Sequence, residues 1–155
     1  MKNKPVHSNE KGQSLVELAL MLVFILVLLA GVVDLGRMMF EYLSIRDAVQ
    51  EGAGYGSIFP GYCAEIEARV RDNLPDANDT VSVTVNGLSC SDAYSADAGQ
   101  AAIGKNPIYG CAGNTLLIAV DHNFEITMPL LGTFIGNNVP MHVGIDDRIV
   151  RPACQ

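Results

Sequence analysis

The sequence predicts an α+β fold, in which a long amino-terminal transmembrane helix continues into an amphipathic helix packed on a small, mostly antiparallel three-stranded sheet. Three observations lead to this prediction. Residues 18–33 form an uninterrupted apolar run, the following turns carry apolar residues at steps of three and four, and three later stretches alternate apolar with polar residues. The first two patterns are typical of helices, and the third is typical of strands.

The apolar run from Leu18 to Val33, LALMLVFILVLLAGVV, contains no charged or polar side chain. With residues 14–17 included, the helix pattern is about 30 Å long, which matches the hydrocarbon thickness of a bilayer. A cleaved secretory signal is disfavoured because the run is long and no A-x-A-like site follows it. A buried helix is disfavoured because so small a domain could hardly cover it on all sides. We therefore expect a single-pass membrane protein.

The basic residues predict the orientation of this span. Those before it and soon after it are Lys2, Lys4, Lys11, Arg37 and Arg46. The excess on the amino-terminal side places that end in the cytoplasm. We therefore expect a cytoplasmic leader at residues 1–12, a transmembrane and amphipathic helix at 13–58, and an extracytoplasmic α+β domain at 59–155. In a bacterium, the chain would lie in the inner membrane with its carboxyl-terminal domain in the periplasm or exterior.

Beyond the span, one helix face stays apolar, and this face carries Leu35, Met38, Tyr42, Ile45 and Val49. Because repeated glycines disfavour helix and supply caps, the helix should end between Gly52 and Gly56.

The rest of the chain predicts a short helix and three strands. The helix occupies residues 62–74, and the strands occupy 80–86, 116–126 and 141–149. Asn86-Gly87 is a turn signal at the end of the first strand. Residues 129–136 are expected to form a short helical turn or loop.

Four cysteines lie in the exported part, namely Cys63, Cys90, Cys111 and Cys154. An even number of cysteines without a C-x-x-C pair favours two disulfides over a zinc or redox site, and three pairings are possible. Residues 87–114 are polar and long for a connection, so we expect a disulfide-braced loop there. Position alone favours the tentative pairing Cys90–Cys111 with Cys63–Cys154.

Composition and motifs argue against several functions. The net charge of −7 repels phosphate, so no nucleic-acid partner is expected. His122 and His142 could meet across predicted adjacent strands, but no acid or cysteine completes a metal site. No nucleophile, base and orienting group can be identified. We therefore expect no enzyme, no catalytic residue, no cofactor and no metal.

Glu17 is a carboxylate at the cytoplasmic edge of the span, five residues after Gly12. An ionised acid in a hydrocarbon-spanning helix is costly, although less so near the interface, and it favours a cationic partner. The simplest explanation for an acid in this position is that its side chain reaches out to the headgroups.

Residues 11–17, KGQSLVE, are similar to the prepilin signal of type IV pilin-like proteins. Residues 36–42, GRMMFEY, and 48–56, AVQEGAGYG, resemble the TadE family of minor pseudopilins from Tad (Flp) type IV pilus systems. The carboxyl half also resembles the family, with a strand at 116–126, then residues 129–132, PLLG, and a final strand.

The resemblance implies a structural subunit of a Tad-type pilus or secretion apparatus that is inserted with the pilus. A prepilin peptidase would cut between Gly12 and Gln13, and the partners would be the membrane, this peptidase and other pilin and pseudopilin subunits. Glu17 would serve assembly by pairing with the terminal ammonium of a neighbouring subunit. The alternative is an uncleaved, membrane-anchored extracytoplasmic module for binding or sensing.

Overall fold

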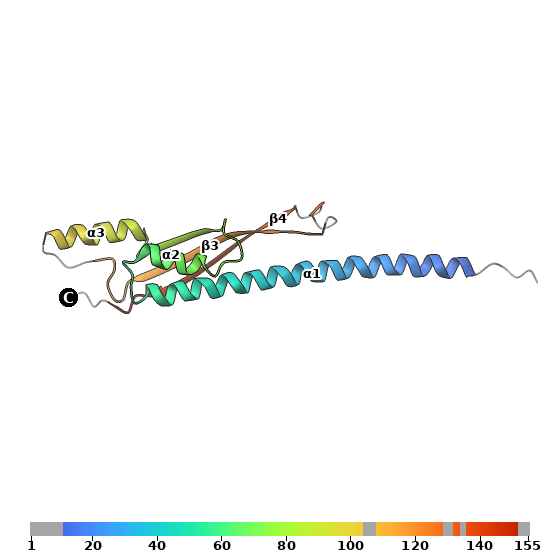
Figure 1. The fold of residues 1–155 in the computed structure, drawn as a ribbon, viewed down its shortest axis with the longest axis horizontal. Coiled ribbons are helices and arrows are strands. Elements are labelled where there is room, and N and C mark those ends of the chain that lie inside the picture. The colour runs from blue at the N-terminus through green and yellow to red at the C-terminus, as the bar shows by residue number, and fades with distance from the viewer. Residues whose placement is uncertain (1–10, 104–107, 129–131, 134–135, 152–155) are drawn as a thin grey trace, which may run out of the picture.

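The computed structural model describes residues 11–103, 108–128, 132–133 and 136–151 of the chain (Figure 1). Its elements are, in chain order, α1 (Lys11–Gly56), α2 (Cys63–Arg71), β1 (Thr80–Val85), β2 (Leu88–Ser89), α3 (Cys90–Ala102), β3 (Thr115–Glu125) and β4 (Asn138–Arg148). The predicted α+β class and the long amino-terminal helix are confirmed. The segment 129–136 falls largely outside the described residues.

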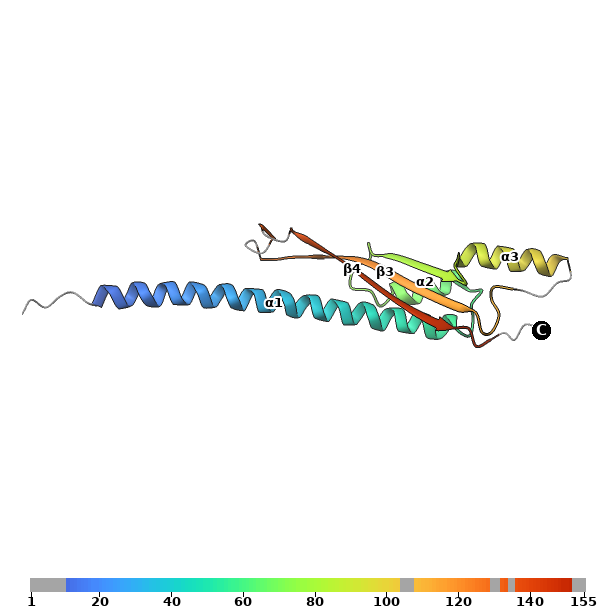
Figure 2. The ribbon, with the colours of Figure 1, turned by 180° about the vertical axis from the view of Figure 1, so that it is seen from behind.

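Helix α1 is much longer than the domain that it carries. It has 46 residues, which corresponds to a length of about 69 Å. Its carboxyl-terminal part lies along the sheet, whereas its amino-terminal part extends away from every other described element (Figures 1 and 2). The domain therefore covers only one end of the helix.

The glycines near the end of α1 serve close packing. A Cβ atom on Gly52 would lie 2.4 Å from Cγ2 of Val70, and one on Gly56 would lie 2.6 Å from Cδ2 of Leu116. The helix ends at Gly56, within the predicted stretch. The glycines therefore also allow α2 and β3 to approach the helix backbone.

The sheet is antiparallel and has the strand order β2-β1-β3-β4. It contains one more strand than predicted, because the two-residue β2 is too short to show an alternating pattern. Asn86 and Gly87 join β1 to β2 and have φ angles of 50° and 85°. Positive φ at both positions is typical of a type I′ turn, as the Asn-Gly signal indicated.

The core lies between one face of the sheet and the two helices α1 and α2. Strand β3 contributes alternate fully buried residues, including Leu116, Ile118 and Val120. They form one hydrophobic cluster with Ile45 of α1 and Ile66 of α2. The opposite face of β3 carries mainly exposed side chains, so among the described elements α1 and α2 cover one face of the sheet and leave the other open.

Helix α3 and strand β2 occupy much of the segment that was predicted as a loop. The hydroxyl of Ser89 caps α3 by accepting a hydrogen bond from the backbone N–H of Asp92, at 3.2 Å. The helix buries only Cys90 and Ala93. Its apolar surface is therefore too small to give the periodic pattern that would have predicted it.

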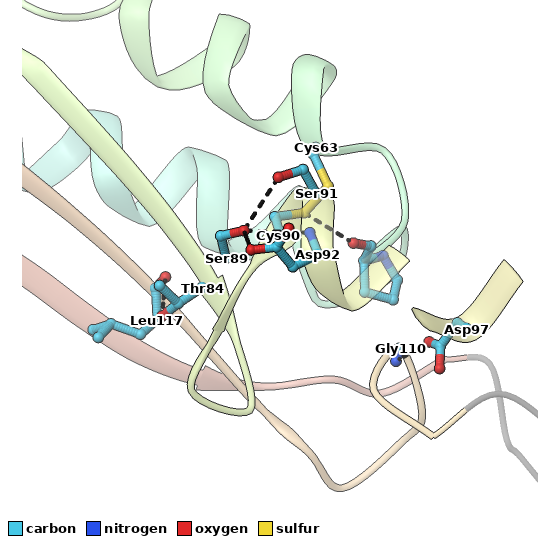
Figure 3. The surroundings of a disulfide bond; sticks show 10 residues. Cys63, Thr84, Ser89, Cys90, Ser91, Asp92, Asp97, Gly110 and Leu117 are labelled. Atoms are coloured by element: carbon cyan, nitrogen blue, oxygen red, sulfur yellow. Dashed lines mark hydrogen bonds between the residues drawn. A yellow bond between two sulfur atoms is a disulfide. The ribbon is translucent and has the colours of Figure 1, made fainter. Parts of the chain in front are cut away.

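The described disulfide joins Cys63 to Cys90, with a Cα–Cα distance of 5.7 Å (Figure 3). The tentative pairing of Cys90 with Cys111 and of Cys63 with Cys154 is therefore wrong. The reason is that Cys90 begins α3, and this end of α3 lies beside the beginning of α2. Cys111 is also disulfide-bonded, and Cys154 lies outside the described residues.

Candidate functional site on the long helix

The amino-terminal half of α1 presents an apolar surface that its own chain does not cover. With the exception of Val27, the large apolar side chains between Leu15 and Val33 are 53–69% exposed. Among the residues that the structure describes, Gly12–Gly56 forms a single helix that is long enough and apolar enough to cross a membrane. This surface fits a single-pass membrane anchor.

Glu17 is the single charged residue in residues 13–33, and its side chain is exposed. The residues predicted to form the processing and assembly sites lie together here, since Gly12, Gln13 and Glu17 border one shallow surface of the first helical turns. Within residues 11–103 and the other described ranges, no cation pairs with Glu17.

A polar contact between α1 and the sheet begins where the apolar run ends. We call it the membrane-proximal clamp, and its side chains are Asp34, Arg37 and Glu41 of α1 with Asp79 and His122 of the domain. The Oδ2 atom of Asp34 accepts the backbone N–H of Met128 at 2.9 Å.

The guanidinium of Arg37 connects the helix side of the clamp to the sheet. It donates a hydrogen bond to the hydroxyl of Thr127 and lies 3.7 Å from Oε1 of Glu41. It also lies 5.6 Å from the centre of the Phe124 ring. Arg37 therefore makes ionic, hydrogen-bonding and cation–π contacts within the interface.

His122 is the buried centre of the clamp. Its Nδ1 atom lies 2.7 Å from Oδ1 of Asp79, and its Nε2 atom lies 3.1 Å from Oε2 of Glu41. Ionised carboxylates only accept hydrogen bonds, so two such partners require both ring nitrogens to donate. This arrangement selects the imidazolium form, which holds α1 to the loop before β1.

Burial and the two carboxylates act in opposite directions on His122. Burial lowers the pKa of His122, whereas the hydrogen bonds and charges of Asp79 and Glu41 raise it. Together the two carboxylates outweigh burial, so the pKa of His122 lies above 6.5. The second carboxylate oxygen of Asp79, Oδ2, is buried and has no hydrogen-bond partner among the described residues. Among the described residues, the Asp79 side chain therefore relies on His122 for its hydrogen bond.

Two sequence predictions are corrected at this site. His122 and His142 do not meet, because His142 pairs with Asp121 on the exposed face at 2.7 Å while His122 points into the interface. The predicted apolar face of α1 is also wrong near the membrane, where Leu35 is 65% exposed and Asp34 faces the sheet. The apolar surface of the span continues outward past residue 33 instead of turning towards the domain.

The sequence contained one signal for the clamp. His122 follows Leu116, Ile118 and Val120 at the alternating positions of β3 that are buried. A histidine at such a position needs polar partners in the interior. Those partners come from α1 and from the loop before β1, and sequence spacing could not identify them.

Comparison with known proteins finds one family match, which lies within α1. Residues 12–54 match the TadE-like protein family. This segment is TadE-like. The resemblance predicted from the sequence is confirmed over these residues, which lie entirely within α1. The matched family is structural and pilus-related. No curated protein and no solved structure matches the chain.

The family match and the domain packing meet on the same helix. The TadE-like segment includes the exposed apolar surface, Glu17 and the three α1 side chains of the clamp. It also includes the buried residues Ile45 and Val49. The TadE-like helix thus carries both a surface that the described chain leaves open and a surface on which the α+β domain packs.

Proposed function

We propose that this chain is a minor pseudopilin, a structural subunit that assembles into a Tad-type pilus or secretion apparatus. The observation that carries the proposal is the long TadE-like helix whose apolar half has no covering within the described chain. Such a surface needs lipid or other apolar helices around it. A subunit that leaves a bilayer for a helical bundle meets each of these environments in turn.

Processing between Gly12 and Gln13 by a prepilin peptidase is part of this proposal. A Cβ atom on Gly12 would have no heavy atom within 4 Å, so packing does not require a glycine there. The fold gives no reason for a glycine at this position, whereas recognition by a peptidase does. The leader would lie in the cytoplasm, and the domain after α1 would lie in the periplasm or outside the cell.

The cut would create an ammonium group on Gln13, one helical turn from Glu17. In the apolar surroundings of an assembly, a carboxylate and an ammonium attract each other far more strongly than in water. Glu17 of one subunit would pair with the new terminus of a neighbour. Because an unpaired charge in that environment is costly, the pair would fix the register between subunits.

Amino-terminal sequencing of the membrane-extracted protein tests the processing step. The expected result is a chain that begins at Gln13, and a Gly12→Leu variant should retain its leader. Ser14→Ala serves as a matched control that leaves the cut unchanged. A natural protein that begins at Met1 would instead favour the uncleaved anchored module.

A Glu17→Ala variant tests the assembly step. Membrane extraction should recover this variant at the wild-type level, because the change makes the span more apolar. Its amount in purified assemblies should fall at least about tenfold, as expected when about 1.4 kcal/mol or more of pairing energy is lost. Incorporation at the wild-type level would rule out this role for Glu17.

A further inference from the structure

An apolar hollow lies at the end of the domain that is opposite to the exposed half of α1. Its volume is about 460 Å³, and its walls include Ile58, Phe59, Tyr62, Tyr94 and Arg151. Helix α3, which carries Tyr94, lies beyond the carboxyl end of α1 (Figure 1). The hollow can therefore be occupied while the amino-terminal half of α1 lies in a membrane or an assembly.

The apolar walls are large and exposed. Ile58 is 44% exposed, Phe59 45%, Tyr62 60% and Tyr94 58%. The rings of Phe59 and Tyr62 meet edge to face with their centres 6.0 Å apart. Tyr94 lies close to Gly61, where a Cβ atom would come within 3.2 Å of the tyrosine ring. Clustered exposed aromatic side chains of this kind are typical of binding surfaces.

Covalent and polar contacts hold the walls in place (Figure 3). The Cys63–Cys90 disulfide ties the beginning of α2 to that of α3, and the Sγ atom of Cys90 lies 3.5 Å from the carbonyl oxygen of Pro60. Asp97 of α3 accepts three backbone N–H groups, from Ile108 at 2.6 Å, Tyr109 at 3.0 Å and Gly110 at 2.7 Å. The hollow is thus formed before any ligand arrives, which lowers the entropic cost of binding.

The two charged residues of the lining differ in their availability. Burial raises the pKa of Asp97, but its three backbone hydrogen bonds lower it more, so its charge is already stabilised. Arg151 also lines the hollow, and among the described residues no carboxylate pairs with its guanidinium. The site therefore combines aromatic walls with one cation that can bind a carboxylate.

A second hollow continues the first. It has a volume of about 720 Å³ and shares Gly61, Tyr62 and Tyr94 with its neighbour. Its other lining residues include Glu65, Ser91 and Ser95, which supply hydroxyl and carboxylate groups. The two tyrosines thus border a continuous groove with an apolar end and a polar end.

We propose that this groove binds an extended acidic peptide segment of a partner protein. A large apolar or aromatic side chain occupies the first hollow, a neighbouring carboxylate binds Arg151, and the peptide backbone crosses the second hollow. A saccharide fits less well, because the lining of the first hollow is mostly apolar and would leave most of the sugar hydroxyl groups without partners after they lose water. The inference stands on the groove alone and does not depend on processing or pilus assembly.

Selection of a random peptide library on the full chain in nanodiscs tests this proposal. Wild-type protein should enrich peptides that carry Phe, Tyr, Trp or Leu beside Asp or Glu. The best peptide, made synthetically, should lose at least about tenfold in affinity with Tyr94→Ala, since truncation of a central aromatic anchor often has this effect. The matched control is Ile103→Ala, which removes an exposed apolar side chain next to the carboxyl end of α3 and should leave binding unchanged.

A charge exchange tests the role of Arg151. Arg151→Glu should weaken binding of the acidic peptide. A peptide whose acidic residue is replaced by Lys should bind the Arg151→Glu variant and should not bind the wild type. Three outcomes would each overturn the proposal: no peptide is enriched, the enriched peptides carry no acidic residue, or the best peptide binds Tyr94→Ala as tightly as wild type. Binding to a glycan array in the absence of peptide binding would overturn it in favour of a saccharide.

Discussion

Helix α1 contacts the sheet in two regions of opposite character. Between Ile45 and Gly56 the contact is apolar, and glycines bring α2 and β3 against the helix backbone. Between Asp34 and Glu41 the contact consists mainly of hydrogen bonds and ion pairs around His122. The apolar region fixes the domain on the helix, whereas the polar region holds the helix where it leaves the domain. We expect the first region to dominate stability and the second to respond to pH.

The largest loss should follow from a cavity in the apolar region. Ile118 is fully buried in the core cluster, so Ile118→Ala should lower the free energy of unfolding by about 2–5 kcal/mol. Leu117→Ala removes a 37% exposed side chain from the same strand and is the matched control. Urea unfolding of the micelle-bound chain, monitored by tyrosine fluorescence, measures the free energy of unfolding of both variants. Equal losses in the two variants would contradict the assignment of the core face.

A smaller loss should follow from removal of the centre of the clamp. His122→Ala leaves Asp79 and Glu41 without their shared partner, which should cost about 1–3 kcal/mol. Hydrogen exchange should also increase at the Met128 amide, because its acceptor Asp34 belongs to the same contact. His142→Ala, on the exposed face, should change neither quantity. A His122 variant that is as stable as wild type would show that the clamp adds nothing to folding.

The two regions also differ in how far the sequence predicts them. The apolar region follows from helical spacing in α1 and from alternation in β3, because burial of one face imposes a period on the sequence. The Asn86-Gly87 turn could likewise be predicted, since its backbone needs residues that accept positive φ. In both cases the physical cause acts within a few neighbouring residues.

The clamp and the disulfide depend on contacts between distant segments. Glu41 lies 81 residues from His122, and the pair meets only after β3 has docked on α1. Cys63 and Cys90 meet because α2 and α3 both begin at that end of the domain. The sequence predicted neither partnership, since the position of one element relative to another is set by the packing of the whole domain. The prediction for Gly12, Gln13 and Glu17 rests on a pattern that is local to one helix end, so it needed no knowledge of the domain packing.

The smallest of the three effects should be a dependence of stability on pH in the clamp alone. The pKa of His122 is raised above its unfolded value of 6.5, so the folded protein binds the proton more tightly than the unfolded chain. The resulting stabilisation is fully present below pH 6.5 and is lost as the pH rises through the raised pKa. The other charged side chains of the clamp are Asp34, Arg37, Glu41 and Asp79. Arg71 also donates a hydrogen bond to the backbone oxygen of Asp79, at 3.1 Å.

The measurement compares wild type with His122→Gln in urea unfolding at a series of pH values from about 6 upward. The wild-type free energy of unfolding should fall across this window, by up to about 1.4 kcal/mol for each unit by which the pKa is raised. The variant should lack this fall, because glutamine does not titrate. The protection factor of the Met128 amide, which corrects for the intrinsic rise of exchange with pH, should fall in the same window, while protection of the amides around Ile118 should follow global unfolding only. A parallel pH response in wild type and variant would place the titrating group elsewhere and would remove the distinction between the two contact regions.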